Sequence, residues 1–246
     1  MTRPVALVTG GSRGIGAALS RRLVEDGWHV AIGYRERSDA ADALVDSLDG
    51  HALALAGDVA SEADVLRMFA ALDAQCGRLD ALVNNAGIVA PATRVADMSA
   101  DRLGRIFATN VLGSFYCARE AVRRMSNAHG GRGGSIVNVS SVAAKLGSPA
   151  EYVDYAASKG AIDTMTIGLA KEVATEGIRV NAVRPGLIET EIHASGGAPD
   201  RVARLAGMVP MQRGGTADEV AALIAWLLSA QASYVTGAII DVAGGR

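Results

Sequence analysis

The chain has 246 residues, a formal net charge of -2 and a pI near 6.1. This length suits one large α/β domain, and half of the residues are apolar while 4 % are aromatic. The charge balance gives no basic stripe for nucleic acid and no polybasic anchor for a membrane, so neither partner is expected. Because no apolar run reaches about 18 uncharged residues and the N-terminus shows no signal peptide, we expect a cytoplasmic protein.

The cysteines and histidines give no support for metal chemistry. Cys76 and Cys117 are not arranged as Cys-x-x-Cys, and the four histidines are scattered singly. We therefore expect two core thiols and no metal site.

A glycine-rich loop follows the first predicted strand, residues 4–9, and precedes a helix over residues 17–26. Its sequence, GGSRGIG over residues 10–16, has the Gly-x-x-x-Gly-x-Gly spacing. Gly10 permits a tight turn, Gly14 lets the backbone approach a pyrophosphate, and Gly16 allows close packing of helix on strand. The helix N-terminus offers unpaired N–H groups to phosphate. This order of elements predicts a dinucleotide site.

The end of the second predicted strand, residues 28–34, bears on the choice of dinucleotide. An NAD site usually has a carboxylate there, whereas this strand ends in Tyr34 and Arg35. Arg35 and Arg13 together could hold a 2′-phosphate bidentately. Glu36 keeps NAD(H) open as the less favoured alternative, because a modest change of turn would aim its carboxylate inward. We expect NADP(H).

The third predicted strand, residues 51–55, leads to Asp58 and Val59. Asp58 is a candidate acceptor for the adenine amino group. The alternative is an ordinary strand-end aspartate that serves the next turn.

Two further helices are predicted from their caps. Residues 38–48 form an amphipathic pattern with Ser38 as the cap, and residues 61–76 follow Ser61. Asp64, three residues after Ser61, completes a predicted capping box.

The fourth predicted strand, residues 79–83, is followed by the run Asn-Asn-Ala-Gly at 84–87. Small residues let the backbone lie against a ribose, and the asparagines could lock the turn to a neighbouring strand. A long helical pattern over 101–128 is interrupted near Asn110, which is an awkward residue within a helix. We expect Asn110 to hold a water or to bend the helix toward Lys159.

The strand that starts at Gly134 delivers the hydroxyl of Ser141, and Tyr155 and Lys159 follow at i and i+4 of a predicted helix. Lowering a phenol pKa from about 10 by three units takes about 4 kcal/mol. An ammonium about 5 Å away supplies roughly 3 kcal/mol at an effective dielectric of about 20. A Tyr-x-x-x-Lys pair alone occurs by chance, and the serine and the glycine loop give this pair its weight. The three side chains predict a proton-transfer site.

The C-terminal third continues the alternation of elements. The helix that carries Tyr155 extends to residue 176, and Gly168 in its middle suggests a close helix contact, which could lie between subunits. A strand over 178–184 precedes PGLIET at 185–190. Residues 191–213 are long and weakly periodic, which predicts an active-site lid, with a merely mobile loop as the alternative.

The last predicted elements are a helix that begins with a capping box of Thr216 and Glu219 and ends near Leu228, and a strand over 239–242. Seven strand patterns therefore alternate with helices. This alternation indicates a doubly wound parallel sheet, with a ligand crevice at the carboxyl ends of its strands.

The motifs, in this order and spacing, resemble the short-chain dehydrogenase/reductase family, in particular its compact subfamily with 3-oxoacyl-carrier-protein reductases and glucose 1-dehydrogenases. The resemblance covers essentially the whole chain and implies a single Rossmann-like α/β domain over residues 1–246. It implies an oxidoreductase for a carbonyl or secondary alcohol, in which Tyr155 is the general acid or base, Ser141 polarises the carbonyl oxygen and Lys159 lowers the tyrosine pKa and binds the ribose. Asn110 would hold a relay water.

The residues expected to bind NADP(H) are Gly10, Ser12, Arg13, Gly14, Ile15, Gly16, Tyr34, Arg35, Asp58, Val59, Asn85, Ala86, Gly87, Tyr155, Lys159, Pro185, Gly186, Ile188 and Thr190. The resemblance also implies a homotetramer, or a homodimer, built on the long helices and the C-terminal strand. A non-catalytic NADP(H)-binding regulator on the same fold is the alternative function. The substrate is not identified by the sequence.

Overall fold

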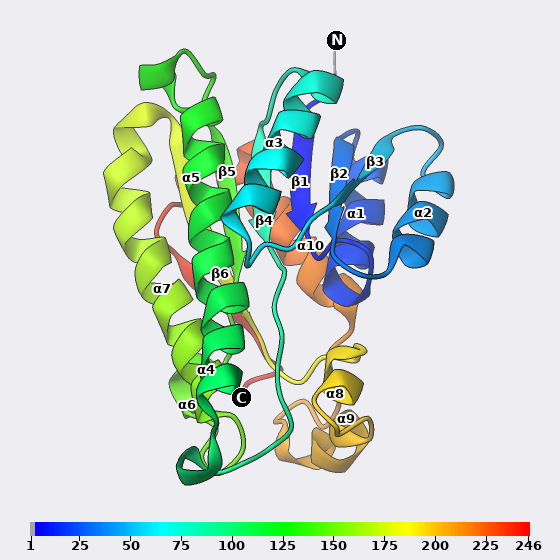
Figure 1. Ribbon diagram of the computed structural model, residues 1–246, viewed down its shortest axis with the longest axis vertical. Helices are drawn as coiled ribbons and strands as arrows, with labels where there is room; N and C mark the ends of the chain where they lie inside the picture. Colours follow the sequence, from blue (N-terminus) through cyan, green and yellow to red (C-terminus); the bar gives the residue numbers. More distant parts are fainter. Residues whose placement is uncertain (1–2) are drawn as a thin grey trace.

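A computed structural model describes residues 3–246, and in them seven parallel strands form one sheet of order β3-β2-β1-β4-β5-β6-β7 (Figure 1). The strands are β1 (Val5–Thr9), β2 (His29–Tyr34), β3 (Ala52–Ala56), β4 (Ala81–Asn84), β5 (Gly134–Val139), β6 (Ile178–Pro185) and β7 (Ile239–Val242). The predicted doubly wound parallel sheet is confirmed. Its order reverses next to β1, where β4 pairs on the side opposite β2.

Helices cover both faces of the sheet. They are α1 (Gly14–Glu25), α2 (Ser38–Asp46), α3 (Glu62–Cys76), α4 (Ala100–Phe107), α5 (Gly113–Met125), α6 (Ala143–Leu146), α7 (Val153–Val173), α8 (Ile192–Ser195), α9 (Arg201–Leu205) and α10 (Ala217–Leu228). Short 3₁₀ turns are η1 (Val95–Asp97), η3 (Asn127–His129), η4 (Ala174–Glu176), η5 (Ala206–Met208) and η6 (Ala230–Ala232).

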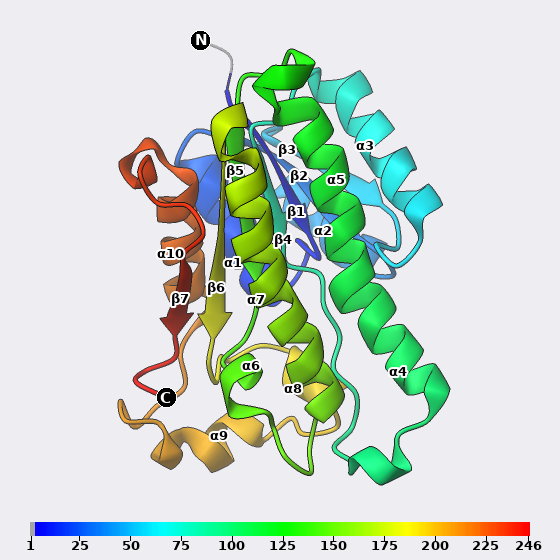
Figure 2. The same ribbon diagram turned by 90° about the vertical axis from the view of Figure 1, so that its left-hand side faces the viewer.

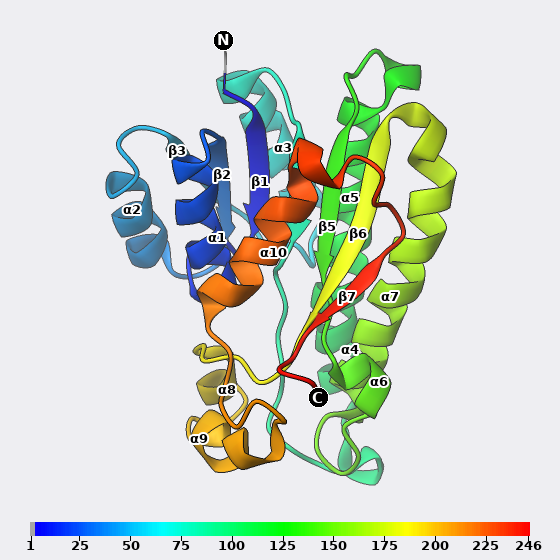
Figure 3. The ribbon, with the colours of Figure 1, turned by 180° about the vertical axis from the view of Figure 1, so that it is seen from behind.

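Two apolar cores lie on the two faces because alternate residues of each buried strand point to opposite sides. Ala6 and Val8 of β1 pack in the core of α1, α2 and α10, which Figure 3 shows from behind. Val5 and Leu7 pack in the core of α3, α5 and α7. Cys117 is fully buried in this second core, as expected, and burial raises the pKa of its thiol to about 12.

Because all seven strands are parallel, their carboxyl ends lie together along one edge of the sheet. The segment with α8 and α9 lies below that edge (Figure 2). The glycine loop, the residues after β2 to β4, Ser141 and the turn after β6 all follow strand ends. This topology brings residues together that are far apart in sequence.

The predicted caps are partly correct. Thr216 and Glu219 form the expected reciprocal capping box of α10. The cap assigned to Ser38 is wrong: Ser38 is the first residue of α2, and Arg37 precedes it without a side-chain cap bond. The predicted box at Ser61 is also incomplete. Ser61 accepts the Asp64 N–H, but the Asp64 carboxylate accepts the Ser61 hydroxyl and the N–H of Asp58 rather than the backbone N–H of Ser61.

The predicted interruption of the long helix is a π-helical turn, η2 (Ala108–Leu112), between α4 and α5. A π turn inserts an extra residue and is frequent at functional sites. By contrast, no atom within residues 3–246 lies within 4 Å of the position a Cβ would take at the exposed Gly168. A close contact of Gly168 within the chain is therefore excluded, and a contact between subunits stays a prediction.

The close packing of α1 on the glycine loop can be tested at Gly16. A Cβ there would overlap the Gly10 carbonyl oxygen and lie 2.8 Å from the Asn85 amide nitrogen. We expect Gly16→Ala to lower the free energy of unfolding by about 1–3 kcal/mol in urea titrations. Gly104→Ala in α4 is the matched control, because it meets open space and removes a helical glycine. Equal stability of the Gly16 variant and the wild type would contradict the close packing.

Candidate functional site

A cavity of about 490 Å³ lies at the carboxyl edge of the sheet. It is lined by the glycine loop, the turns after β2 to β5, the start of α7 and the segment after β6. Of the residues predicted to bind a cofactor or catalyse a reaction, all but Gly16 and Asn110 line it. Those that line it are Gly10, Ser12, Arg13, Gly14, Ile15, Tyr34, Arg35, Asp58, Val59, Asn85, Ala86, Gly87, Ser141, Tyr155, Lys159, Pro185, Gly186, Ile188 and Thr190.

The glycine loop has the conformation that a pyrophosphate site needs. Gly10 and Gly14 have φ angles of 60° and 49°, a region that other residues rarely adopt. The N-terminus of α1 carries no side-chain cap, so its first N–H groups and the positive end of its dipole are available to an anion. The loop therefore fits the diphosphate of a dinucleotide.

The turn after β4 is locked to β1, as expected from its asparagines. The Asn85 amide donates to the carbonyls of Thr9 and Gly10, both at 2.9 Å, and the Thr9 hydroxyl accepts the N–H groups of Asn85 and Ala86. Asn84 donates to the Asn138 side chain of β5 at 2.9 Å. These bonds fix the floor of the cavity between the two halves of the sheet.

The charged groups at the end of β2 are already engaged with one another. Arg35 pairs with Glu36, and its guanidinium lies 3.6 Å from the Asp58 carboxylate. Asp58 also accepts the N–H of Ala60 at 2.9 Å, which is the local turn bond considered as the alternative to adenine binding. Arg13 is exposed, and within residues 3–246 no carboxylate forms an ion pair with it. A phosphate bound here would contact the guanidinium of Arg13, which has no ion pair among the described residues, and that of Arg35, which two carboxylates flank.

The two serines at the end of β5 have different roles. Ser140 donates to the Lys159 carbonyl at 3.1 Å and is thereby used inside the fold. Ser141 accepts the Ala143 N–H at 3.1 Å and forms a hydrogen bond with the Tyr155 phenol. Of the two hydroxyls, only that of Ser141 reaches the phenol.

The phenol and the ammonium lie together, as the spacing of Tyr155 and Lys159 predicts. The Lys159 Nζ is 5.7 Å from the centroid of the Tyr155 ring and donates to the Val139 carbonyl at 2.7 Å. A Cβ placed on Gly87 would lie 3.5 Å from that Nζ and 3.5 Å from the Asn110 Oδ1, so this glycine leaves the ammonium accessible from the cavity.

Burial controls the protonation of both groups. It raises the pKa of Tyr155, and the hydrogen bond with Ser141 opposes the rise. It lowers the pKa of Lys159 to about 8, and the charge of Asp163 opposes the fall. Our expectation that Lys159 lowers the tyrosine pKa is thus not met, because desolvation of the phenolate dominates. Tyr155 holds its proton at neutral pH, which is the form a general acid needs.

Asn110 lies outside the cavity lining and braces its wall. Its Oδ1 accepts the Ile88 N–H at 2.8 Å, and its amide donates to the Ile88 carbonyl and to the Ser158 hydroxyl at 3.0 and 3.1 Å. Both amide N–H groups are therefore used by the protein. The π turn directs this side chain across to α7, and the role of Asn110 in holding a relay water stays a prediction.

The turn after β6 approaches the glycine loop. A Cβ on Gly14 would lie 3.2 Å from the Thr190 methyl group, and one on Gly186 would lie 2.8 Å from the Ala243 Cα. Ile188 forms an isolated bridge with Gly215. This turn thus crosses the cavity between the glycine loop and the C-terminal strand.

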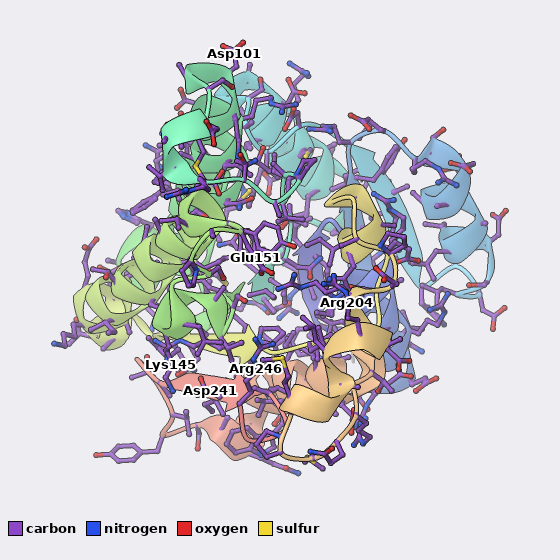
Figure 4. The ribbon with its side chains drawn as sticks, turned by 90° about the horizontal axis from the view of Figure 1, so that it is seen from below. Asp101, Lys145, Glu151, Arg204, Asp241 and Arg246 are labelled. Carbon is purple, nitrogen blue, oxygen red and sulfur yellow. The ribbon has the colours of Figure 1, made fainter. Side chains whose placement is uncertain are left out.

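Sequence reasoning missed a cluster at the other end of the cavity. Arg201 donates to the Tyr152 hydroxyl at 2.9 Å and to the Glu151 carboxylate at 2.7 Å, and its guanidinium lies 4.9 Å from the Tyr152 ring centroid. The pKa of Glu151 is lowered by Arg201 and, to a lesser extent, by Arg204 and Arg246. Figure 4, a view from below onto the carboxyl ends of the strands, labels Glu151, Arg204 and Arg246. The only feature of the sequence that could have indicated this cluster is Tyr152, a second tyrosine three residues before Tyr155.

None of the helices in residues 3–246 is long and apolar enough to cross a membrane.

Comparisons with known proteins agree over nearly the whole chain. A family model described as enoyl-(acyl carrier protein) reductase matches residues 10–246. The chain is 56 % identical to the uncharacterized oxidoreductase YgfF of Escherichia coli (strain K12), over 98 % of this chain and 99 % of that protein. It is 35 % identical to glucose 1-dehydrogenase 2 of Bacillus subtilis (strain 168), over 100 % and 95 % of the two chains.

A solved structure has the same fold. The crystal structure of 3-ketoacyl-(acyl-carrier-protein) reductase from Brucella melitensis, complexed with NADH, has a TM-score of 0.93 and 33 % identity. The match covers 99 % of this chain and 98 % of that one.

Proposed function

Because the chain belongs to the short-chain dehydrogenase/reductase family, we propose that it is an NADP(H)-dependent oxidoreductase that interconverts a carbonyl compound and a secondary alcohol. The proposal depends on one observation: Ser141, Tyr155 and Lys159 meet in the cavity that the glycine loop also lines. Family membership supports the oxidoreductase class, and these contacts support the roles of the three residues.

In the direction of reduction, Tyr155 donates its phenolic proton to the carbonyl oxygen of the substrate. Ser141 donates a hydrogen bond to the same oxygen and so stabilises the negative charge that develops there. Lys159 stabilises the phenolate that remains after proton transfer and is close enough to the cavity to bind a ribose hydroxyl. A nicotinamide dinucleotide, when bound, supplies the hydride to the carbonyl carbon.

The role of the phenol is tested by Tyr155→Phe. We expect kcat to fall by about 10²–10⁴-fold, since general-acid catalysis contributes that much, while NADPH affinity measured by fluorescence titration changes little. Activity is followed as NADPH oxidation against acetoacetyl thioesters, quinones, sugars, steroids and small diketones. Tyr234→Phe, which removes a fully exposed phenol outside the cavity lining, is the control and should retain turnover. Turnover of the Tyr155 variant within tenfold of wild type would contradict the role, and no turnover by wild type would favour a regulator.

NADP(H) is proposed over NAD(H) because Arg13 and Arg35 line the same end of the cavity. Arg13 can bind a 2′-phosphate without breaking an ion pair among the described residues. Arg35 would have to give up its ion pairs with Glu36 and Asp58 to bind the phosphate. A dianionic phosphate can form more charge-assisted bonds with a guanidinium than one carboxylate does. The flanking carboxylates nevertheless leave NAD(H) as the alternative.

Substitution of these arginines separates the two cofactors. We expect Arg13→Ala and Arg35→Ala each to lower kcat/KM for NADPH by about 10–100-fold, the value of a charge-assisted hydrogen bond, and to leave the value for NADH nearly unchanged. Arg37→Ala is the control, because Arg37 is exposed and paired with Asp39 at 2.7 Å. Equal losses with both cofactors would contradict NADP(H) preference.

The segment 191–213 is proposed as a substrate lid. It carries α8 and α9, and Arg201 of α9 connects it to Glu151 and Tyr152, the two residues that precede α7. Because the Arg201 side chain is 13 % exposed and lines the cavity, these bonds support a lid that is held closed over the substrate end.

Assembly into a homotetramer, or a homodimer, is proposed from an apolar surface on α5, α7 and the π turn. Phe115, Leu112 and Ile167 are 48 %, 46 % and 41 % exposed, and a groove between α5 and α7 is lined by Phe115, Met165 and Leu169. An apolar surface of this kind is typical of subunit interfaces. The exposed Gly168 would allow a partner helix to approach closely.

A charge on this surface should prevent assembly. We expect Phe115→Glu to reduce the molar mass in light scattering after size-exclusion chromatography to that of a smaller oligomer or monomer, because an unpaired carboxylate would be buried at the interface. Leu66→Glu on α3 is the control and should keep the wild-type mass, because Leu66 is 44 % exposed, similar to Phe115, but lies on another helix. A wild-type protein that is itself monomeric would refute the assembly.

A further inference from the structure

Asp163 lies one helical turn beyond Lys159 on α7 and faces the same buried region. It is 8 % exposed, and Lys159 is 4 % exposed. One carboxylate oxygen, Oδ2, accepts two hydrogen bonds from the Arg184 guanidinium, at 3.0 and 2.8 Å. The other oxygen, Oδ1, is buried and has no hydrogen-bond partner among residues 3–246. A buried acceptor without a partner is costly and calls for an explanation.

Arg184 in turn belongs to a row of alternating charges. Its guanidinium lies 3.6 Å from Asp241 of β7, and Asp241 pairs with Lys145 of α6 at 2.8 Å (Figure 4). The Lys145 side chain is 53 % exposed. Read from the surface inward, the charges are Lys145, Asp241, Arg184, Asp163 and Lys159, with each sign followed by its opposite. Neither Asp163 nor Arg184 lines the cavity.

The elements around α7 bring no other carboxylate to Lys159 within residues 3–246. On α7 itself, Asp154 is paired with Arg102 of α4 at 2.7 Å, and Tyr155 faces Lys159 as a phenol. The π turn and β5 present the neutral side chains of Asn110 and Ser140. The charged groups of β6, β7 and α6 on this side are those of the row just described, and Glu176 of η4 bonds to Ser126.

We propose that Asp163 is a positioning residue of the site: held by Arg184, it keeps the ammonium of Lys159 protonated where the Val139 carbonyl holds it, between Tyr155 and the cofactor cavity. The inference rests on the proposed function for its catalytic meaning, although not for its test. Arg184 orients the carboxylate through Oδ2. The charge of the carboxylate then acts on the Lys159 ammonium one helical turn away, without a direct ion pair between the two side chains. The burial that lowers the pKa of Lys159 is thereby opposed by a fixed charge of the fold.

The proton on Lys159 can be observed directly, because the chain has three lysines, Lys145, Lys159 and Lys171. With lysine labelled at the ε carbon by ¹³C, NMR signals are assigned through Lys145→Arg and Lys171→Arg. In wild type we expect a midpoint of about 8 for Lys159. In Asp163→Asn it should fall by about one pH unit or more, since a nearby carboxylate favours the charged ammonium by that amount. Asp163→Glu should restore most of the difference.

Asp80→Asn is the matched control, because Asp80 is a poorly exposed carboxylate paired with an arginine at the opposite edge of the sheet. It should lower Tm as a broken ion pair does and leave the Lys159 midpoint unchanged. If Asp163→Asn does not fold, the double variant with Arg184→Met removes both charges and should still lower the midpoint. An unchanged midpoint in a folded Asp163 variant overturns the proposal, whatever its effect on Tm.

Kinetics provides the second readout. The alkaline limb of the kcat profile for carbonyl reduction should move to lower pH in Asp163→Asn, in step with the NMR midpoint, while KM changes little. A wild type that reduces no carbonyl would refute the proposed function and leave the NMR test valid. An active Asp163→Asn enzyme with an unshifted limb would refute the positioning role alone.

Discussion

A buried ammonium beside a partly buried phenol is the arrangement on which the rest of this structure depends. Removing the Lys159 charge from water is costly unless protein groups replace the lost hydration. The Val139 carbonyl at the end of β5 supplies one hydrogen bond at 2.7 Å, and Asp163 opposes the effect of burial. Asp163 itself is paired with Arg184 of β6, so the groups that compensate the buried charge of Lys159 extend from α7 toward the surface.

Tyr155 experiences two opposing effects. Burial favours the neutral phenol and keeps the proton in place, whereas the hydrogen bond with Ser141 favours the phenolate. A simple estimate from the spacing of Tyr155 and Lys159 considers only the charge and so predicts a lowered pKa. The structure adds desolvation, which is the larger contribution. Burial keeps the proton on the phenol, and the hydrogen bond with Ser141 makes its release less costly. This combination suits an acid that must keep its proton until a carbonyl oxygen develops negative charge.

The sequence predicted the features that depend on neighbours along the chain. Alternating strands and helices, the glycine loop, the capping box at Thr216 and the break near Asn110 all follow from local patterns, and the structure has them. Asp64 was misjudged because its carboxylate bonds to the backbone of Asp58 outside the helix. The bonds of Arg201 to Glu151 and of Arg184 to Asp163 join residues 50 and 21 positions apart, and no local pattern contains them.

The turn after β2 shows why a rule about residue type at a strand end gives only part of the answer. By this rule a carboxylate indicates NAD and an arginine indicates NADP. This turn has both, at the adjacent positions 35 and 36. In the structure the two neutralise each other, and Asp58 from the next turn adds a second carboxylate near Arg35. The positive charge left for a phosphate is then that of Arg13, which belongs to the glycine loop rather than to β2. We propose that the balance among the charges of these three turns, which the sheet order brings together, sets the cofactor preference.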